Sequence, residues 1–205
     1  MLWGGRQVAS FSKSIDHSIN CLNVTTVLGM NEPQESRQAN MTAVEGSEMW
    51  QQYLQPLKAR EVRLGSPAPS GASGSKKWLQ DFMEHCGENC TVDFLALHYY
   101  GTNVNEFKEF LEDYHDTFNL TIWVTEWACQ NMGGPSNQCS MSEISDFLRE
   151  MQGFMDRTEW IERYAWYGVK TPGEMHGVNT QNAMMDPDGL INDLGRQYID
   201  VNGNI

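Results

Sequence analysis

Residues 25–33 read Thr-Thr-Val-Leu-Gly-Met-Asn-Glu-Pro, and this stretch decides the fold. Residues 25–30 form a β-rich, mostly apolar run that predicts a strand, and the run ends in Asn-Glu-Pro. From Thr42 to Lys58 the apolar side chains recur at helical spacing, and Thr42 with Glu45 forms a capping-box signature at the start. These residues therefore predict one β/α unit.

The same alternation of strand and helix continues along the chain. Further strands are expected at residues 62–66, 92–100, 121–125 and 163–169, and the opening segment Met1–Trp3 is a sixth strand candidate. Four further helices are expected. One carries residues 78–83, the next carries residues 107–118, a third starts at the capping box of Ser140 and Glu143, and the last spans residues 190–199. Alternation without hairpin signals predicts parallel strands joined by helical crossovers.

Polar or acidic groups stand at the ends of several successive predicted strands. This pattern favours a (β/α)8 TIM barrel over a doubly wound sheet, because a barrel builds its active site from the carboxyl ends of many strands. No Gly-x-Gly-x-x-Gly phosphate loop follows any strand, which weakens a dinucleotide-binding alternative. The predicted fold class is α/β, with residues 1–205 as a single catalytic domain, although typical barrels have about 250 residues.

The composition excludes several classes of protein. Hydrophobic residues make up 40% of the chain, too many for a disordered protein. A formal net charge of −13 argues against nucleic acid as a partner, because phosphate binding needs clustered lysine and arginine. No run of eighteen or more apolar residues predicts a membrane span, and no signal peptide is recognisable at the start. A globular protein with a neutral or weakly charged ligand fits best.

The five cysteines suggest an oxidising compartment. Cys86 and Cys90 enclose a short loop, and Cys129 and Cys139 enclose a turn region, so both pairs are disulfide candidates. Cys21 is left over. A zinc site is the rival interpretation, but the spacings are not those of ribbon-type sites and no histidine falls at ligand spacing beside them. No metal site is therefore expected.

Four Asn-x-Ser/Thr sequons indicate secretion. They begin at Asn23, Asn40, Asn89 and Asn119, and none has proline in the middle position. Chance is the alternative explanation, because such tripeptides are common in any chain rich in asparagine and threonine.

Two glutamates, Glu32 and Glu126, each follow an apolar strand-like run, in Gly-Met-Asn-Glu-Pro and Trp-Val-Thr-Glu-Trp. Two carboxyl groups delivered by different strands are what a glycoside hydrolase needs. One protonates the leaving oxygen of the acetal, and the other stabilises or attacks the anomeric carbon. The pair predicts an enzyme that cuts a polysaccharide.

The strings MLWGG, VLGMNEPQ, LGSPAPS, WLQDFMEHC, DFLALHYYG, TIWVTEWACQ and ERYAWYG resemble one enzyme family. They are similar to the fungal cell-wall glycosyl hydrolases of glycoside hydrolase family 128, whose catalytic domain is of the alkali-sensitive linkage protein type. The resemblance covers almost the whole chain. It implies a clan A (β/α)8 barrel that hydrolyses β-1,3-glucan with retention of configuration.

Carried over by position, the resemblance makes Glu32 the acid/base and Glu126 the nucleophile. It also implies that Asn31 hydrogen-bonds the sugar 2-hydroxyl, a contact that strengthens in the transition state. His98 and Tyr100 share one face of their strand by its period of two, where they are suited to orient the nucleophile and contact the sugar. A buried capping asparagine is the alternative for Asn31, and a satisfied core histidine is the alternative for His98.

Three tryptophans complete the candidate site. Trp166 matches the clan's aromatic platform beneath the bound sugar, and Trp3 and Trp127 are weaker subsite candidates at strand ends. Ordinary core packing explains an isolated tryptophan equally well.

Members of the family have two further β/α units before the segment that here reads Met1-Leu2-Trp3-Gly4-Gly5. The resemblance therefore implies a barrel that lacks its first two β/α units in this chain, with open strand edges. The missing signal peptide fits the same N-terminal truncation, and the expected location is secreted or in the cell wall.

The function expected from these observations is a retaining endo-β-1,3-glucanase that acts as a monomer on fungal cell-wall glucan, without a cofactor. Two alternatives stay open, a non-catalytic β-glucan-binding wall protein and a clan A hydrolase of another β-glycan such as mannan or cellulose. Catalytic motifs do not separate these glycans, because loops determine specificity.

Overall fold

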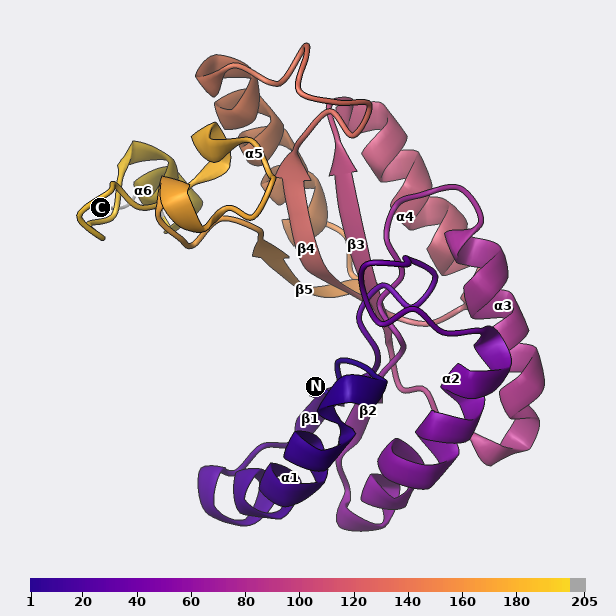
Figure 1. Cartoon of the computed structure of the whole chain (residues 1–205). Helices are drawn as coiled ribbons and strands as arrows, with labels where there is room; N and C mark the ends of the chain where they lie inside the picture. The colour runs from indigo at the N-terminus through magenta and orange to yellow at the C-terminus, as the bar shows by residue number, and fades with distance from the viewer. Residues whose placement is uncertain (200–205) are drawn as a thin grey trace. The chain divides into compact units, whose positions relative to one another are not determined.

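The structure is a computed structural model that describes residues 1–199 (Figure 1). It divides into two compact units. The first unit comprises Met1–His98 with Leu120–Trp123, and the second comprises Tyr99–Asn119 with the chain from Val124 onward. The helices and strands are, in chain order, α1 (Val8–Leu22), β1 (Thr26–Leu28), α2 (Ala43–Met49), β2 (Arg63–Gly65), α3 (Ser75–Cys86), β3 (Leu95–Gly101), α4 (Val104–Phe118), β4 (Ile122–Cys129), α5 (Met141–Asp156), β5 (Ile161–Trp166) and α6 (Asp193–Ile199).

The first unit contains the β/α unit predicted from residues 25–58. β1 pairs with β2 in parallel, with Val27 opposite Leu64. The predicted capping box at the start of α2 is confirmed, because Thr42 and Glu45 bond to each other's backbone N–H. α2 packs against α3, and the ring of Phe82 on α3 meets Trp50, the residue directly after α2, edge-on at 5.5 Å between centroids.

The helix predicted from Thr42 to Lys58 is regular over a shorter range. α2 ends at Met49, a π-helical turn follows at Trp50–Leu54, and a 3-10 helix follows at Gln55–Arg60. Pro56 stands in the first turn of that 3-10 helix. A proline has no N–H to donate and its ring clashes with the carbonyl four residues earlier, so a continuous α-helix cannot pass through this position.

Two features of the start of the chain differ from the prediction. Met1–Trp3 forms no strand, although the Leu2 N–H donates to the Leu28 carbonyl at 3.0 Å and the Trp3 carbonyl accepts from Asn31 at 2.9 Å. The segment therefore runs beside β1 without a regular ladder. The helix α1 was not predicted, and Phe11 is its only buried residue.

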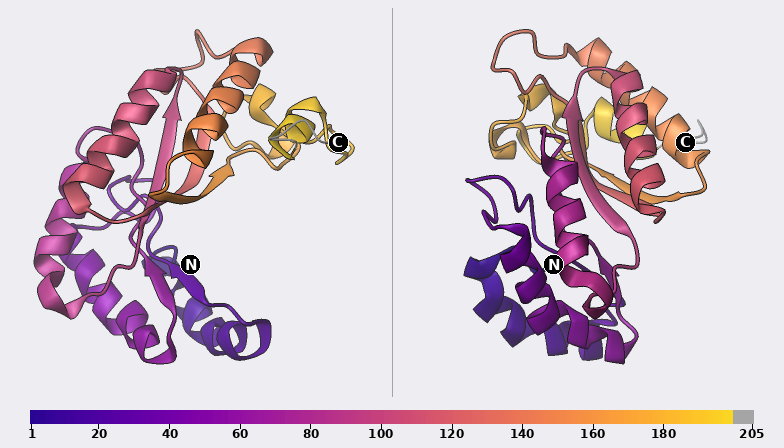
Figure 2. Two further views of the ribbon diagram at one scale, coloured as in Figure 1. Left: turned by 180° about the vertical axis from the view of Figure 1, so that it is seen from behind. Right: turned by 90° about the vertical axis from the view of Figure 1, so that its right-hand side faces the viewer.

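A three-stranded sheet has the order β3-β4-β5, and the second unit contains β5 together with β3 from Tyr99 and β4 from Val124 onward. α4 and α5 cover one face of this sheet (Figures 1 and 2). Phe107 of α4 and Phe147 of α5 lie 6.0 Å apart between ring centroids, and both lie near the fully buried Trp127 of β4. The capping box of Ser140 and Glu143 starts α5 as predicted.

The strands β3 and β4 run in parallel. The Leu95 N–H donates to the Thr121 carbonyl, and the Gln130 N–H donates to the Gly101 carbonyl, so residue numbers rise together along both strands. The predicted mixed α/β content with parallel strands is confirmed. Within residues 1–199 the strands form a two-stranded and a three-stranded sheet and do not close a barrel.

Both predicted disulfides are present. Cys86 is bonded to Cys90 with their Cα atoms 5.2 Å apart, and Cys129 is bonded to Cys139 with their Cα atoms 6.0 Å apart. Cys21 is free and exposed on α1, as expected for the leftover cysteine. The zinc alternative is thereby excluded for the four bonded cysteines.

The sequon asparagines lie on the surface. All four are exposed: Asn23, Asn40, Asn89 and Asn119. They remain glycosylation candidates. No helix among residues 1–199 is both long enough and apolar enough to cross a membrane.

Candidate active site

Glu32 lies in the first unit, four residues after β1 ends. Its backbone adopts a left-handed conformation with φ 41°, which costs a non-glycine residue roughly 1 kcal/mol. Its N–H donates to the carbonyl of Ala68, in the loop after β2, at 2.8 Å. The neighbouring Asn31 forms a parallel bridge with the same Ala68. Glu32 is therefore held in a strained conformation by a second loop, as is typical of functional sites.

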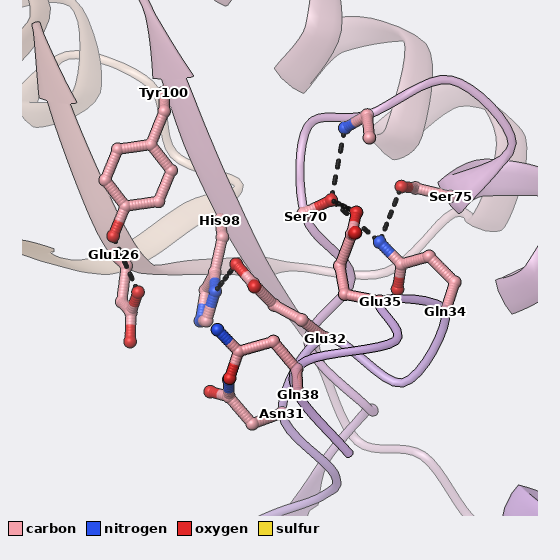
Figure 3. A network of polar contacts seen from close by, with 11 residues as sticks. Asn31, Glu32, Gln34, Glu35, Gln38, Ser70, Ser75, His98, Tyr100 and Glu126 are labelled. Carbon is pink, nitrogen blue, oxygen red and sulfur yellow. Dashed lines mark hydrogen bonds and ion pairs between the residues drawn. The ribbon is translucent and has the colours of Figure 1, made fainter. Parts of the chain in front are cut away.

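The carboxyl group of Glu32 pairs with His98 of β3. Oε1 of Glu32 lies 2.9 Å from Nδ1 of His98 (Figure 3). Both residues are buried, with 9% of Glu32 and 2% of His98 exposed. An acid/base has to give up a proton and later take one back, and the imidazole lies within hydrogen-bond distance of the carboxyl group. The arrangement suits the proton-donor role predicted for Glu32.

Glu126 belongs to β4 in the second unit and has a different partner. The Tyr100 hydroxyl donates to Oε2 of Glu126 at 2.7 Å (Figure 3). This distance is typical of an O–H···O hydrogen bond. Both residues are half-buried. A nucleophilic carboxylate has to be held in a fixed orientation, and the Tyr100 hydroxyl holds one oxygen of Glu126.

Asn31 is buried next to Glu32. Its backbone N–H donates to Trp3, and its side-chain amide lies 3.4 Å from Oε1 of Gln38. Gln38 therefore orients the side-chain amide of Asn31 that is predicted to contact a sugar hydroxyl.

The predicted aromatic contacts lie deeper than expected. Trp166 is 4% exposed, and its indole N–H donates to the Asn182 carbonyl at 2.9 Å. Trp127 is fully buried and stands edge-on to Trp166 at 4.5 Å. Because Trp127 has no exposed surface to offer a sugar, we do not carry it into the proposed site. The platform role of Trp166 stays a prediction.

Trp3 is half-buried in the first unit. It lines a groove of about 280 Å³ between α1 and β1. Its predicted role as a subsite residue is untested by this placement.

Tyr167 is a candidate that the sequence reasoning missed. It follows β5 directly, is half-buried, and its ring meets Tyr100 edge-on at 5.8 Å between centroids. The ammonium of Lys170 lies 4.0 Å from the Tyr167 ring centroid. The aromatic string around Trp166 was the available signal, but it gave no reason to prefer Tyr167 to its neighbour.

A family model described as "Glycosyl hydrolase catalytic core" matches residues 1–198. The chain is also 30% identical to a curdlan-specific exo-β-1,3-glucanase of glycoside hydrolase family 128, subgroup III, from Blastomyces gilchristii, solved in complex with glucose. That match covers 97% of this chain and 79% of the other, with a TM-score of 0.79. The chain belongs to glycoside hydrolase family 128. The family expected from the sequence is thereby confirmed.

This family 128 chain is also similar to two further proteins. It is 27% identical to a subgroup II endo-β-1,3-glucanase from Sorangium cellulosum, over 98% of this chain and 79% of that one, with a TM-score of 0.81. It is 34% identical over 177 residues to alkali-sensitive linkage protein 1 of Schizosaccharomyces pombe, which covers 85% of this chain. The match covers 32% of that protein, so the chain spans about a third of its length.

Proposed function

We propose that this family 128 chain is a retaining glycoside hydrolase that cleaves β-1,3-glucan, with Glu32 as the acid/base and Glu126 as the nucleophile. The observation that carries the proposal is that each glutamate has a partner suited to its step. Glu32 shares a buried contact with an imidazole, and Glu126 accepts a phenolic hydroxyl. The substrate class is supported by the two solved relatives, both β-1,3-glucanases.

The proposed reaction has two steps. In the first, Glu32 protonates the glycosidic oxygen while the Glu126 carboxylate attacks the anomeric carbon, which forms a glycosyl-enzyme and releases the leaving chain. In the second, Glu32 takes a proton from water, and the water displaces Glu126 with net retention. A retaining mechanism requires the two carboxyl groups about 5 to 5.5 Å apart. Asn31, His98 and Tyr100 serve as positioning and binding groups, and no cofactor enters either step.

We further propose a TIM-barrel-like α/β fold, to which residues 1–199 contribute β/α units without closing the barrel, and an endo mode of attack. The fold is supported by the successive β/α units and by the TM-scores of 0.79 and 0.81. The two solved relatives differ in their mode of attack, since one is an exo-enzyme and the other an endo-enzyme. Early products from reduced laminari-oligosaccharides distinguish the modes. A spread of internal cuts supports endo action, and glucose alone contradicts it.

A secreted or wall-associated location is part of the proposal. It is supported by two disulfides and four exposed sequons. The expected result is a secreted or wall fraction whose electrophoretic mobility changes after treatment with an N-glycan endoglycosidase. Recovery of the protein in the cytosol, without glycans, would contradict it.

The function is tested by incubating the purified chain with laminarin, curdlan, mannan and cellulose. Shortened β-1,3-oligosaccharides support the proposal, and products from mannan or cellulose alone assign another glycan. Retention on insoluble glucan without products identifies a binding protein. The aromatic content that suggested such a binder now supports it less, because Trp127 and Trp166 pack inside the second unit.

Glu32→Gln and Glu126→Gln are each expected to abolish hydrolysis, and retained activity in either variant would refute the assignment. Glu48→Gln on α2 is a matched control, because Glu48 is an exposed glutamate outside the proposed site.

A further inference from the structure

The loop after β2 holds the backbones of both members of the Glu32–His98 pair. The carbonyl of Ala68 accepts the N–H of Glu32 at 2.8 Å, and the next carbonyl, that of Pro69, accepts the N–H of His98 at 3.2 Å. Ala68 also donates its own N–H to Met30 at 2.8 Å. Two consecutive carbonyls of one loop therefore fix the backbone positions of Glu32 and His98, which carry the carboxyl and the imidazole.

Ser70, the residue directly after Pro69, is held by a hydrogen bond from Gln34. The side-chain amide of Gln34 donates one hydrogen to the Ser70 hydroxyl and one to the Ser75 hydroxyl, both at 2.8 Å (Figure 3). Ser70 in turn donates to Oε1 of Glu35 at 2.8 Å. Gln34 stands two residues after Glu32. Hydrogen bonds of Ser70 with Gln34 and with Glu35 therefore join the loop of the proton donor to the loop after β2.

Two features of this arrangement lower the free energy of unfolding. Oε1 of Gln34 is buried without a hydrogen-bond partner, and an unpaired buried acceptor costs free energy. Glu32 is held with φ 41°, which a chain without these ties would relax. Strain and an unsatisfied group persist where a geometry is needed for another reason.

We propose that Gln34 is a positioning residue for the proton donor. By holding Ser70, Gln34 keeps the Ala68 and Pro69 carbonyls in place, and these keep the Glu32 carboxyl against His98. The inference rests on the proposed function, since it assigns a role in the acid/base step. Gln34 itself does not touch the substrate in this role.

The test compares Gln34→Ala with Gln55→Ala in the full chain. Gln55 is a matched control in the same unit, because its side chain also joins separate segments by hydrogen bonds, to Trp50 and Thr91, away from the Glu32 loop. Each variant is assayed on two substrates, laminarin and dinitrophenyl laminaribioside. Laminarin needs a proton on its leaving oxygen, whereas dinitrophenolate leaves without one.

The expected result is selective. Gln34→Ala should lower kcat/KM on laminarin by about 10- to 100-fold, because small displacements of a catalytic group have effects of this size. On the dinitrophenyl substrate kcat/KM, which reports only the steps up to the glycosyl-enzyme, should stay close to the Gln55→Ala value. An equal loss of kcat/KM on both substrates, or a loss no larger than that of Gln55→Ala on laminarin, would overturn the proposal.

A second variant and a second measurement keep the outcomes separate. Ser70→Ala removes the same tie from the other side, so it should reproduce the selectivity and serve if Gln34→Ala does not fold. Hydrogen exchange at the Glu32 and His98 amides needs no activity. If the wild-type chain cleaves neither substrate, the proposed function fails, and the exchange still decides the positioning. Faster exchange in Gln34→Ala than in Gln55→Ala supports it, and equal exchange refutes it.

Discussion

Replacing Tyr100 by phenylalanine removes the hydroxyl that donates to the proposed nucleophile, Glu126, and keeps the aromatic ring. The lost bond is a 2.7 Å donation to Oε2 of Glu126. Hydrogen bonds to charged groups contribute about 1.5–3 kcal/mol, which corresponds to about 10- to 150-fold in a rate constant. This range is the upper bound on the effect, because the bond also stabilises the ground-state carboxylate before attack.

The two steps of the proposed reaction should respond differently to Tyr100→Phe. In the second step Glu126 leaves as a carboxylate, so a hydroxyl that donates to the developing charge accelerates it. Without the hydroxyl, hydrolysis of the glycosyl-enzyme should become rate-limiting. We therefore expect kcat to fall, KM to fall with it, and the covalent intermediate to accumulate.

The assay combines steady-state kinetics on laminari-oligosaccharides with intact-protein mass spectrometry during turnover. Tyr164→Phe is the matched control, because Tyr164 also donates to a carboxylate, Asp156, at 2.7 Å, on the exposed side of the second unit. A kcat for Tyr100→Phe within the range of Tyr164→Phe would refute the reasoning. So would a large loss of kcat with an unchanged KM and no accumulated adduct.

Three further predictions concern stability. Backbone and side-chain hydrogen bonds from Ser140 hold the pKa of Glu143 below its ordinary value of 4.5, so this carboxylate stabilises the fold above that pH and the contribution is lost as the pH falls through the lowered pKa. Thermal unfolding should therefore show a deficit for Glu143→Gln at neutral pH that disappears in acid, and an equal deficit at both would contradict it. Asn182→Ala should reduce the free energy of unfolding by about 2–5 kcal/mol in denaturant titrations, because it leaves the buried N–H and carbonyl of Cys129 without their partner; a change below about 1 kcal/mol would refute this. Replacing Cys129 and Cys139 by serine should cost about 2–3 kcal/mol by the same measurement, from the loop entropy of a separation of 10 residues, and no loss would contradict it.

Local rules predicted the regular elements well where they depend on nearby residues. The capping boxes at Thr42 and Ser140 and the strand at residues 62–66 follow from short patterns, and the structure contains all three. The helix α1 escaped prediction because it has no capping side chain at Gln7 and buries only Phe11.

The sequence named the candidate site residues but could not name their partners. The period of two in β3 placed His98 and Tyr100 on one face, yet it could not say that one contacts Glu32 and the other Glu126. Gln34 gave no signal, because a glutamine in a loop has no pattern of its own. Its partners lie 36 and 41 residues away, so only the folded chain shows them.

The central claim is that Glu126 attacks the sugar while Glu32 supplies the proton. It is tested most directly by incubating the chain with a fluorinated laminaribiosyl donor, whose glycosyl-enzyme hydrolyses slowly, and mapping the adduct by peptide mass spectrometry. The account predicts one laminaribiosyl adduct on Glu126, formed also by Glu32→Gln because fluoride leaves without protonation. An adduct on another residue, or none on a chain that still cleaves laminarin, would contradict it.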